Sequence, residues 1–401
     1  MKAVIRPSRA SGRVSAPPSK SMGHRLLICA GLAEGKSTVK NFGMSQDILA
    51  TLDCLRALGA GIEISGKDIH ISGTGGGFAG SDLYCRESGS TLRFFIPICL
   101  LSRAQYTLYG SGRLLERPLS IYEDICREQD LGFKKSPGSL SVRGPLLSGD
   151  LRFAGNVSSQ FVSGLLFALP LLDRDSRIHL IPPVESRSYI DMTMHAQSLF
   201  GIRTYWEDEN TIMVPGGQRY AGGDVSVEGD YSNSAFLEAF NMVGGDVTVL
   251  GLKGSSLQGD SVYRELYKKL SSERPIIDLS DCPDLGPVLF ALASALNGAS
   301  FTGTERLRIK ESDRIQAMKD ELIKLGADLE TEGDTVSIPG SVLHRPDVPL
   351  SGHNDHRIVM ALSVLLSLTG GTIEGAEAVS KSFPDFFDIL RRLNIEVDLY
   401  D

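Results

Sequence analysis

The sequence predicts an α/β protein of two domains, built from six repeats, three per domain, with helices packed inside and short-stranded sheets outside. Three observations support this fold class. The chain has 401 residues, more than one hydrophobic core usually serves. An amphipathic helix that ends at a glycine and precedes two short strands recurs along the chain. A polar cluster that opens onto an almost wholly apolar helix alternates with it.

The amphipathic unit is clearest in residues 312–340. From Ile315 to Leu325, apolar residues recur three and four positions apart, which predicts one buried helical stripe. Gly326 follows as the expected helix stop. In chain order the copies are residues 46–73, 117–144, 188–216, a partial copy at 260–279, 312–340, and a partial copy at 384–401.

The second unit opens with small polar residues and continues as a helix that is apolar on every face. Such a helix must be covered on all sides, so three of them would form the core of each domain. The six copies are residues 19–33, 87–101, 156–172, 230–240, 281–296 and 354–368. Their starts are marked by Lys20, Gly89, Ser159, Asn233, Asp284 and Asp355. Most of these spacings are close to one sixth of the chain, which supports the sixfold repeat.

Composition excludes several classes of function. The net charge of −8 argues against a broad nucleic-acid-binding surface, which needs excess Lys and Arg. The six cysteines are scattered, without a CxxC pair or histidines at metal-ligand spacing, which indicates a reducing compartment and no structural zinc. The N-terminus lacks the apolar core of a signal peptide, and no apolar run reaches the roughly 18 residues of a membrane span. We therefore expect a cytoplasmic protein with no membrane partner.

The polar clusters at the starts of the buried helices are candidate anion sites. Unpaired N–H groups and the helix dipole favour an anion there, and basic residues such as Lys20, Arg25 and Arg357 recur at this place in the repeat. Each cluster alone has an ordinary explanation, such as a capped helix or a surface ion pair of Glu116 with a neighbouring arginine. Their recurrence favours a two-domain cleft that holds a ligand with several phosphates or carboxylates.

Residues 306–318 alternate acids and bases at a helix start. Lys310 and Arg314 lie four positions apart, with Glu311 and Asp313 between them. A solvated charge run is the usual explanation of such a segment. The same alternation also suits proton transfer beside a bound anion.

The motifs, taken together, resemble those of the 5-enolpyruvylshikimate-3-phosphate (EPSP) synthase family. They are PPSKSMGHR, SGSTLRF, GRLLERP, SSQFVSGLL, IKESDRI, NDHR and KSFPDFF, in the family's order, and the resemblance runs from about residue 13 to about residue 388. It implies an inside-out α/β barrel in each of two domains, each made of three βαβαββ units. The implied domains are residues 1–13 plus 228–401 and residues 14–227, with the active site in the cleft between them.

The resemblance implies transfer of the enolpyruvyl group of phosphoenolpyruvate to the 5-hydroxyl of shikimate 3-phosphate, with release of phosphate, and no cofactor or metal. The residues implied for shikimate 3-phosphate are Lys20, Ser21, Arg25, Ser158, Ser159, Gln160, Ser186, Tyr189, Asp284 and Lys310. Those implied for phosphoenolpyruvate are Lys20, Gly89, Arg113, Gln160, Arg314, Arg357 and Lys381. A monomeric enzyme of chorismate and aromatic amino acid biosynthesis is the expected form.

The family chemistry also implies three catalytic residues. Asp284 matches the general base that takes the proton of the acceptor hydroxyl, and Glu311 suits proton exchange at C3 of the enolpyruvyl group. Lys20 could assist as an acid. Two positions depart from some members: Glu87 stands where some have Asn, and Arg306 where some place Asn against shikimate 3-phosphate.

Two alternatives remain open at this point. One is a UDP-N-acetylglucosamine enolpyruvyl transferase. That family has a Lys-Asn pair where this chain has Lys20-Ser21. It also carries a reactive cysteine in the loop that matches residues 110–118, where this chain has no cysteine. A non-catalytic anion-binding relative would keep the cleft, but retention of both Asp284 and Glu311 argues against it.

Overall fold

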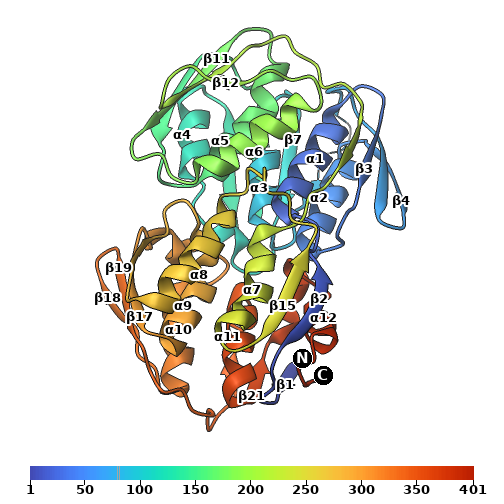
Figure 1. Cartoon of the computed structure of the whole chain (residues 1–401). Helices are drawn as coiled ribbons and strands as arrows, with labels where there is room; N and C mark the ends of the chain where they lie inside the picture. The colour runs from blue at the N-terminus through green and yellow to red at the C-terminus, as the bar shows by residue number, and fades with distance from the viewer. Residues whose placement is uncertain (79, 81) are drawn as a thin grey trace. The chain divides into compact units, whose positions relative to one another are not determined.

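The computed structural model describes residues 1–78, 80 and 82–401, which form two compact units (Figure 1). Unit 1 comprises Met1–Pro17 and Gly229–Asp401, and unit 2 comprises Pro18–Glu228. The first crossing was expected after residue 13, but it follows Pro17. The strand β2 (Ser11–Ser15) pairs along its whole length with β15 (Asp246–Leu250) of unit 1, so the chain leaves that unit only after β2.

Among the described residues, five four-stranded sheets share one pattern, in which a parallel pair is extended by two antiparallel strands. In unit 2 their strand orders are β14 (Asp224–Ser226), β3 (Lys36–Lys40), β5 (Asp68–Ser72), β4 (Gly61–Ser65); β6 (Asp82–Tyr84), β7 (Gln105–Tyr109), β9 (Ser139–Arg143), β8 (Gly132–Ser136); and β10 (Asp150–Ala154), β11 (Ser176–Ile181), β13 (Thr211–Val214), β12 (Tyr205–Trp206). In unit 1 they are β16 (Ile276–Asp278), β17 (Gly298–Thr302), β19 (Thr335–Pro339), β18 (Glu330–Glu332); and β20 (Leu350–Ser351), β21 (Gly371–Glu374), β1 (Lys2–Ile5), β22 (Val397–Tyr400).

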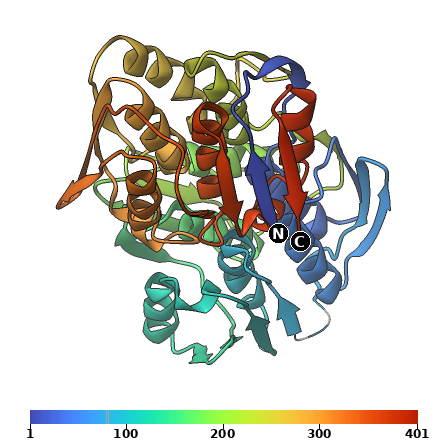
Figure 2. The same cartoon turned by 90° about the horizontal axis from the view of Figure 1, so that it is seen from below.

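The last of these sheets joins the two ends of the chain. The N-terminal strand β1 lies between β21 and β22, with Ala3 opposite both Ile373 and Leu399. Figure 2 shows this blue strand flanked by red ones, with the two termini side by side. The N-terminal strand β1 therefore completes the sheet of the last repeat, whose other strands come from the C-terminal part of the chain.

The remaining repeat, the fourth in chain order, departs from the expected βαβαββ pattern. Its sheet, as far as the structure describes the chain, contains only the parallel pair β2 and β15. After β15 the chain forms a short 3₁₀ turn (Gly259–Val262) and the helix α8 (Tyr263–Ser272), and β16 of the next repeat begins at Ile276. Three residues between α8 and β16 leave no room for two further strands.

The strands at the two crossings are exchanged between repeats. β2 leads into the first buried helix of unit 2 but pairs with β15 of unit 1. β14 leads into the first buried helix of unit 1 but pairs with β3 of unit 2. Each unit therefore completes one of its sheets with a strand whose own helix belongs to the other unit.

The helices follow the predicted alternation. The six that were expected to be buried are almost wholly so: α1 (Lys20–Leu32), α3 (Gly89–Cys99) and α5 (Ser159–Ala168) in unit 2, and α7 (Tyr231–Met242), α9 (Gly286–Ala295) and α11 (His356–Thr369) in unit 1. The amphipathic ones are α2 (Gln46–Ala57), α4 (Ser120–Glu128), α6 (Arg187–Ser198), α8, α10 (Arg314–Lys324) and α12 (Phe386–Arg392). The expected stripe on α10 and its stop at Gly326, with φ +84°, are confirmed.

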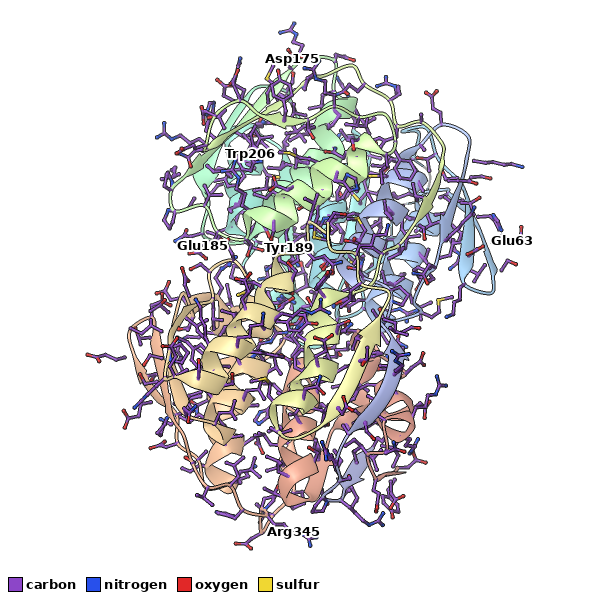
Figure 3. The ribbon with its side chains drawn as sticks, in the orientation of Figure 1. Glu63, Asp175, Glu185, Tyr189, Trp206 and Arg345 are labelled. Atoms are coloured by element: carbon purple, nitrogen blue, oxygen red, sulfur yellow. The ribbon has the colours of Figure 1, made fainter. Side chains whose placement is uncertain are left out.

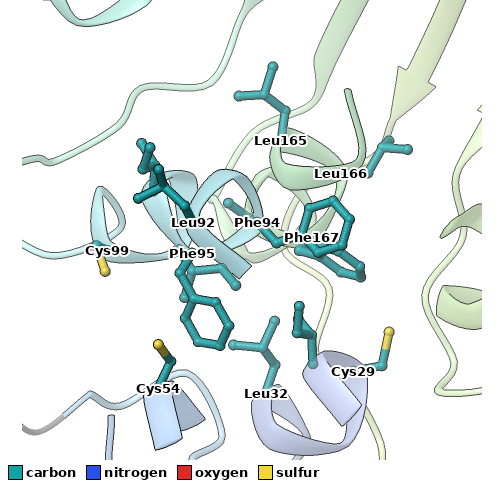
Figure 4. Close-up of a cluster of buried hydrophobic side chains, with 14 of the residues drawn as sticks. Cys29, Leu32, Cys54, Leu92, Phe94, Phe95, Cys99, Leu165, Leu166 and Phe167 are labelled. Carbon is teal, nitrogen blue, oxygen red and sulfur yellow. The ribbon is translucent and has the colours of Figure 1, made fainter. Parts of the chain in front are cut away.

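Each unit has its own continuous apolar core. In unit 2, Phe94 of α3 packs edge-to-face on Phe167 of α5, beside Leu32 of α1 (Figure 4). Across the described residues, the helices are all too short or too polar to span a bilayer. Each unit thus contains three buried helices, and each of these helices begins at one of the polar clusters in the sequence.

Candidate active site

Serine side chains cap the three buried helices of unit 2. Ser19 accepts the N–H of Met22 at the start of α1, Ser88 caps α3, and Ser158 accepts the N–H of Gln160 at the start of α5. The first backbone N–H groups of an α-helix have no partner within the helix, and the helix dipole makes this end electropositive. Helix starts of this kind favour phosphate or carboxylate ligands.

Arg25 joins three helices of unit 2. Its Nε donates to Thr193 Oγ1 (2.8 Å), its Nη1 to the carbonyl of Ser21 (2.7 Å), and its Nη2 to Ser163 Oγ (3.3 Å) and the carbonyl of Tyr189 (3.0 Å). Burial lowers the pKa of Arg25 to about 10, so the guanidinium remains charged at neutral pH. Four of its five N–H donors are thus engaged with protein groups.

The start of α6 lies against the same arginine. Ser186, the residue before α6, is buried and has a left-handed backbone with φ +54°. The ring of Tyr189, labelled in Figure 3, has its centre 5.8 Å from the Arg25 guanidinium carbon. Arg25 therefore fixes the position of Tyr189, three residues after Ser186, relative to α1.

Lys20, the first residue of α1, is paired with a carboxylate that the sequence analysis did not identify. Its Nζ lies 2.8 Å from Asp47 Oδ2, and both side chains are largely buried. Next to it, His24 is fully buried and its Nδ1 lies 2.7 Å from Thr51 Oγ1. Burial, with the neighbouring charges of Lys20 and Arg25, lowers the pKa of His24 well below its usual value, which keeps the imidazole neutral.

Gln160 connects α5 with α3. Its Oε1 accepts from Arg93 Nη1 (2.7 Å), and its Nε2 donates to Ser90 Oγ (3.0 Å). Arg93 was not among the predicted site residues. A signal was present, since it is a lone cation on a helix that is otherwise apolar, the same pattern that drew attention to Arg357.

Arg113, which was predicted to bind phosphoenolpyruvate, lies in the loop before Pro118. Its side chain is 62% exposed, and its Nε pairs with Glu116 Oε2 at 3.2 Å, the ordinary surface ion pair. The arginine beside Gly89 is instead Arg117: a Cβ added at Gly89 would lie 2.5 Å from Nη1 of Arg117. A 3₁₀ turn at Leu114–Glu116 separates the two arginines, which directs only the second toward the start of α3.

In unit 1, Arg314 lies among three carboxylates. It is 1% exposed, and its nitrogen atoms lie 2.9 Å from Asp355 Oδ2, 3.0 Å from Asp284 Oδ1 and 2.9 Å from Glu311 Oε2. A buried guanidinium requires such compensation. Burial alone would lower the pKa of Arg314, but the three carboxylates raise it above the usual value.

Asp284 in turn contacts three cations. Besides Arg314, it accepts from Arg357 Nη2 at 2.8 Å and lies 3.5 Å from Lys310 Nζ. Desolvation lowers the pKa of Lys310 to about 8, and the nearby Asp284 only partly offsets this effect. These residues were predicted from segments far apart in the sequence, and within unit 1 the fold brings them into contact.

Asp355 organises the start of α11. Its Oδ1 caps the helix by accepting the backbone N–H of Arg357 (2.9 Å), while its Oδ2 accepts from Arg314 and from Ser312 Oγ (3.1 Å). Although burial favours the neutral acid, the charge of Arg314 lowers the pKa of Asp355 below its usual value. From the sequence, Asp355 was predicted only as the start of a repeat, although an Asp directly before a helix is a typical N-cap.

Lys381 contacts the residue before Asp355. Its Nζ donates to the carbonyl of Asn354 at 2.7 Å, and its side chain is largely buried. Of the two departures from the family pattern, Arg306 is buried and donates to the carbonyl of Ser280. Glu87 lies beside Gly112, where an added Cβ would be 2.9 Å from its Oε2.

Each unit thus carries one group of candidate site residues, nearly all of them polar. The unit 2 group contains Lys20, Ser21, Arg25, Gly89, Ser90, Arg93, Arg117, Ser158, Ser159, Gln160, Ser186 and Tyr189. The unit 1 group contains Asp284, Lys310, Glu311, Arg314, Asn354, Asp355, Arg357 and Lys381. The first offers neutral donors and cations for anions, and the second combines cations with carboxylates that can accept a proton.

Comparison with known proteins finds relatives over nearly the whole chain. The family profile that matches residues 4–390 is described as EPSP synthase (3-phosphoshikimate 1-carboxyvinyltransferase). A protein named 3-phosphoshikimate 1-carboxyvinyltransferase from Clostridium kluyveri is 40% identical over 98% of this chain and 97% of its own length. One of the same name from Clostridioides difficile is 37% identical over 98% of both. A solved EPSP synthase from Acinetobacter baumannii superposes with a TM-score of 0.79 at 26% identity, over 99% of both chains.

Proposed function

This chain belongs to the EPSP synthase (3-phosphoshikimate 1-carboxyvinyltransferase) family, and we propose that its two polar groups bind and activate the two substrates of that reaction. The enzyme transfers the enolpyruvyl group of phosphoenolpyruvate to shikimate 3-phosphate, in the shikimate pathway of aromatic amino acid biosynthesis. The observation that carries the residue roles is the contact of Asp284 with Arg314, Arg357 and Lys310.

Shikimate 3-phosphate is assigned to the unit 2 group, with Asp284 and Lys310 reaching it from unit 1. The starts of α1 and α5 supply N–H groups, and Ser21, Ser158, Ser159 and Gln160 supply neutral donors for a phosphate. Lys20 adds a charge that Asp47 now neutralises. Because most of the donors of Arg25 are already engaged, it supports this site mainly through its charge and by holding α1, α5 and α6 together.

Phosphoenolpyruvate is assigned to Gly89, Gln160 and Lys20 in unit 2 and to Arg314, Arg357 and Lys381 in unit 1. Arg117 replaces Arg113 in this set because it lies beside Gly89. Glycine at position 89 lets the Arg117 guanidinium lie against the start of α3, since an added Cβ there would be 2.5 Å from Nη1 of Arg117.

The two arginines of this loop give a matched test. Arg117→Ala is expected to raise the KM for phosphoenolpyruvate at least about 30-fold, because it removes a charge-assisted hydrogen bond to an anion. Arg113→Ala removes only a surface ion pair and should change that KM less than about threefold. Steady-state kinetics with each substrate varied in turn would measure both, and a larger effect of Arg113→Ala would restore the original assignment.

Asp284 is proposed as the general base. The 5-hydroxyl of shikimate 3-phosphate attacks C2 of phosphoenolpyruvate, and its proton passes to Asp284. In the same step C3 takes a proton from Glu311, which must enter the reaction as the protonated acid, and a tetrahedral ketal results. Return of a proton from C3 to Glu311 then re-forms the double bond as phosphate leaves, with Lys20 assisting as an acid. A carboxylate beside three cations is a weak base. We infer that the substrate phosphate and carboxylate take over those cations, so that Asp284 becomes basic only when both substrates are bound.

The direct test is a phosphate-release assay. Phosphoenolpyruvate with shikimate 3-phosphate should give one phosphate per turnover, and phosphoenolpyruvate alone should give none. Release with UDP-N-acetylglucosamine as acceptor would identify the related transferase instead. Binding of both anions without any release would identify a non-catalytic relative.

We propose that one pair of substrates is held by both units at once, in a cleft between the two domains, since each contributes half of the cations. Without ligand the like charges oppose approach, and bound phosphates would neutralise them. Small-angle scattering is expected to show a smaller radius of gyration with saturating shikimate 3-phosphate than without it. An unchanged radius would contradict this proposal.

Lys310 makes substrate binding dependent on pH. Its pKa is lowered to about 8, so the ammonium is present below that pH and is lost as the pH rises through it. We expect kcat/KM for shikimate 3-phosphate to fall up to about tenfold per pH unit above pH 8. Lys310→Arg stays charged at these pH values and should lack this decline. A wild-type profile that matches Lys310→Arg up to pH 9.5 would contradict the role of Lys310.

We further propose that the enzyme is a cytoplasmic monomer. All six cysteines are free and buried, as is usual in reducing compartments. Each unit buries its own apolar core, so neither needs a second copy to complete it. Light scattering after size-exclusion chromatography should give a mass near 43.3 kDa, and twice that mass would contradict the proposal.

A further inference from the structure

We propose that Glu321 is a positioning residue for the phosphoenolpyruvate-binding loop Ser351–Arg357. This inference rests on the proposed function of that loop. Glu321 lies near the end of α10, seven positions after Arg314, which begins the same helix. It touches none of the residues assigned to substrate, and it was not identified as a candidate from the sequence.

Both carboxylate oxygens of Glu321 are used, and the residue is only 1% exposed. Oε1 lies 2.7 Å from His353 Nε2, and Oε2 accepts the backbone N–H of Ser351 at 2.9 Å. Lys324, one helical turn later, donates to both oxygens at 3.0 and 2.8 Å. Two of these three partners belong to the loop, so the buried charge holds the loop against α10.

The loop needs such a restraint because its backbone is strained. His353 and Asn354 are consecutive non-glycine residues with φ +47° and +52°, in the left-handed region that side chains disfavour. The preceding Gly352 has no space for a side chain, since an added Cβ would lie 2.6 Å from Val359 Cγ2. Without the bonds to Glu321, residues 353 and 354 have a reason to relax toward ordinary backbone angles.

Relaxation of this loop would displace the cations assigned to phosphoenolpyruvate. The carbonyl of Asn354 accepts from Lys381, and Asp355 accepts from Arg314 and caps the helix that carries Arg357. The helix α10 therefore holds the loop at two points, through Arg314 at its start and through Glu321 near its end. The second contact fixes the strained residues, and the first is part of the site itself.

The matched variants separate positioning from general stability. Glu321→Ala and His353→Ala are expected to raise the KM for phosphoenolpyruvate at least about tenfold, because misplaced cations bind the anion poorly. Binding of shikimate 3-phosphate alone, measured by calorimetry, should change less than about threefold, since most of that site lies in unit 2. Lys324→Ala removes a partner of Glu321 but no loop contact, and should leave both values within about threefold of the wild type.

Two conservative variants sharpen the test. Glu321→Gln can accept from the N–H of Ser351 and donate to an unprotonated His353, so it should largely restore the KM for phosphoenolpyruvate. His353→Gly loses the side-chain bond but tolerates a positive φ, so it should be less impaired than His353→Ala. An Ala variant that is no worse than the Gly variant would overturn the strain argument. A Glu321→Ala enzyme with an unchanged KM for phosphoenolpyruvate, or with equal losses for both substrates, would overturn the proposal.

Hydrogen exchange of the backbone amides in residues 351–357, measured without substrates, gives a readout independent of activity. Exchange should be faster in Glu321→Ala and His353→Ala than in the wild type and Lys324→Ala. Unchanged exchange in all variants would overturn the proposal even if the wild type is active. An inactive wild type with faster exchange in these two variants would instead reject the proposed function and keep the restraint.

Discussion

Asp284→Asn is expected to lower kcat by about 10³-fold, while the KM for each substrate changes less than about tenfold. This pattern is expected when a general base is lost. Asparagine keeps the size of the side chain and one oxygen that can accept from Arg314 or Arg357. It cannot take the proton of the acceptor hydroxyl. The cations would remain in place, but the step that forms the ketal would lose its proton acceptor.

The measurement is phosphate release in the steady state, together with rapid quenching of a single turnover. If Asp284 is the base, the variant should form the ketal slowly, and little of it should accumulate. Asp320→Asn is the matched control, since Asp320 is exposed on α10 and its Oδ1 contacts only Gln316 among the described bonds. A normal rate in Asp284→Asn would contradict the assignment, and equal losses in both variants would point to a general effect on folding.

The repeats and the helix starts could be predicted because they follow from local patterns. Apolar residues around a whole helix require burial, and small polar residues before it require a cap, so the positions of α1 to α12 were visible in the sequence. The missing strands of the fourth repeat were not predicted. The partial copy at residues 260–279 predicted its helix correctly. The absence of two strands after that helix follows from the short connection to β16.

The contact between Arg117 and the start of α3 could not be predicted from the sequence. Arg113 and Arg117 lie in one short loop, and the family resemblance implied Arg113 as the phosphoenolpyruvate ligand. Their difference arises from the 3₁₀ turn between them, which exposes the first and places the second beside Gly89. Long-range contacts of this kind depend on tertiary packing, which a local pattern does not encode.

The ionic contacts of unit 1 show the same limit. Lys310, Glu311 and Arg314 were singled out because acids and bases alternate there. In the structure Lys310 and Arg314 contact Asp284, and Glu311 contacts Arg314. The central role of Asp355 was not predicted, because its partner Arg314 lies 41 positions away. Sequence spacing identified the charged residues, whereas their pairing required the fold.

Arg314→Met is expected to have the largest effect on stability, a loss of about 3–5 kcal/mol in the unfolding free energy of unit 1. The substitution removes the guanidinium that contacts Asp284, Glu311 and Asp355 together, and Asp355 is fully buried. Phosphoenolpyruvate turnover should fall below detection. Urea unfolding followed by far-UV circular dichroism would measure the loss, with the transition of unit 2 as an internal reference.

Arg308→Met is the matched control, because Arg308 is partly exposed and forms only a 3.7 Å pair with Asp313. A surface pair of this kind contributes about 0–1 kcal/mol.

The pH dependence of the unfolding free energy provides a second check. The pKa of Asp355 is lowered in the folded state, so its stabilisation is present above the usual carboxyl value and is lost as the pH falls through the folded value. The difference between wild type and Arg314→Met should therefore narrow in acid, below about pH 4. A constant difference down to pH 2, or a loss no greater than that of Arg308→Met, would show that these buried charges are not paired as the structure places them.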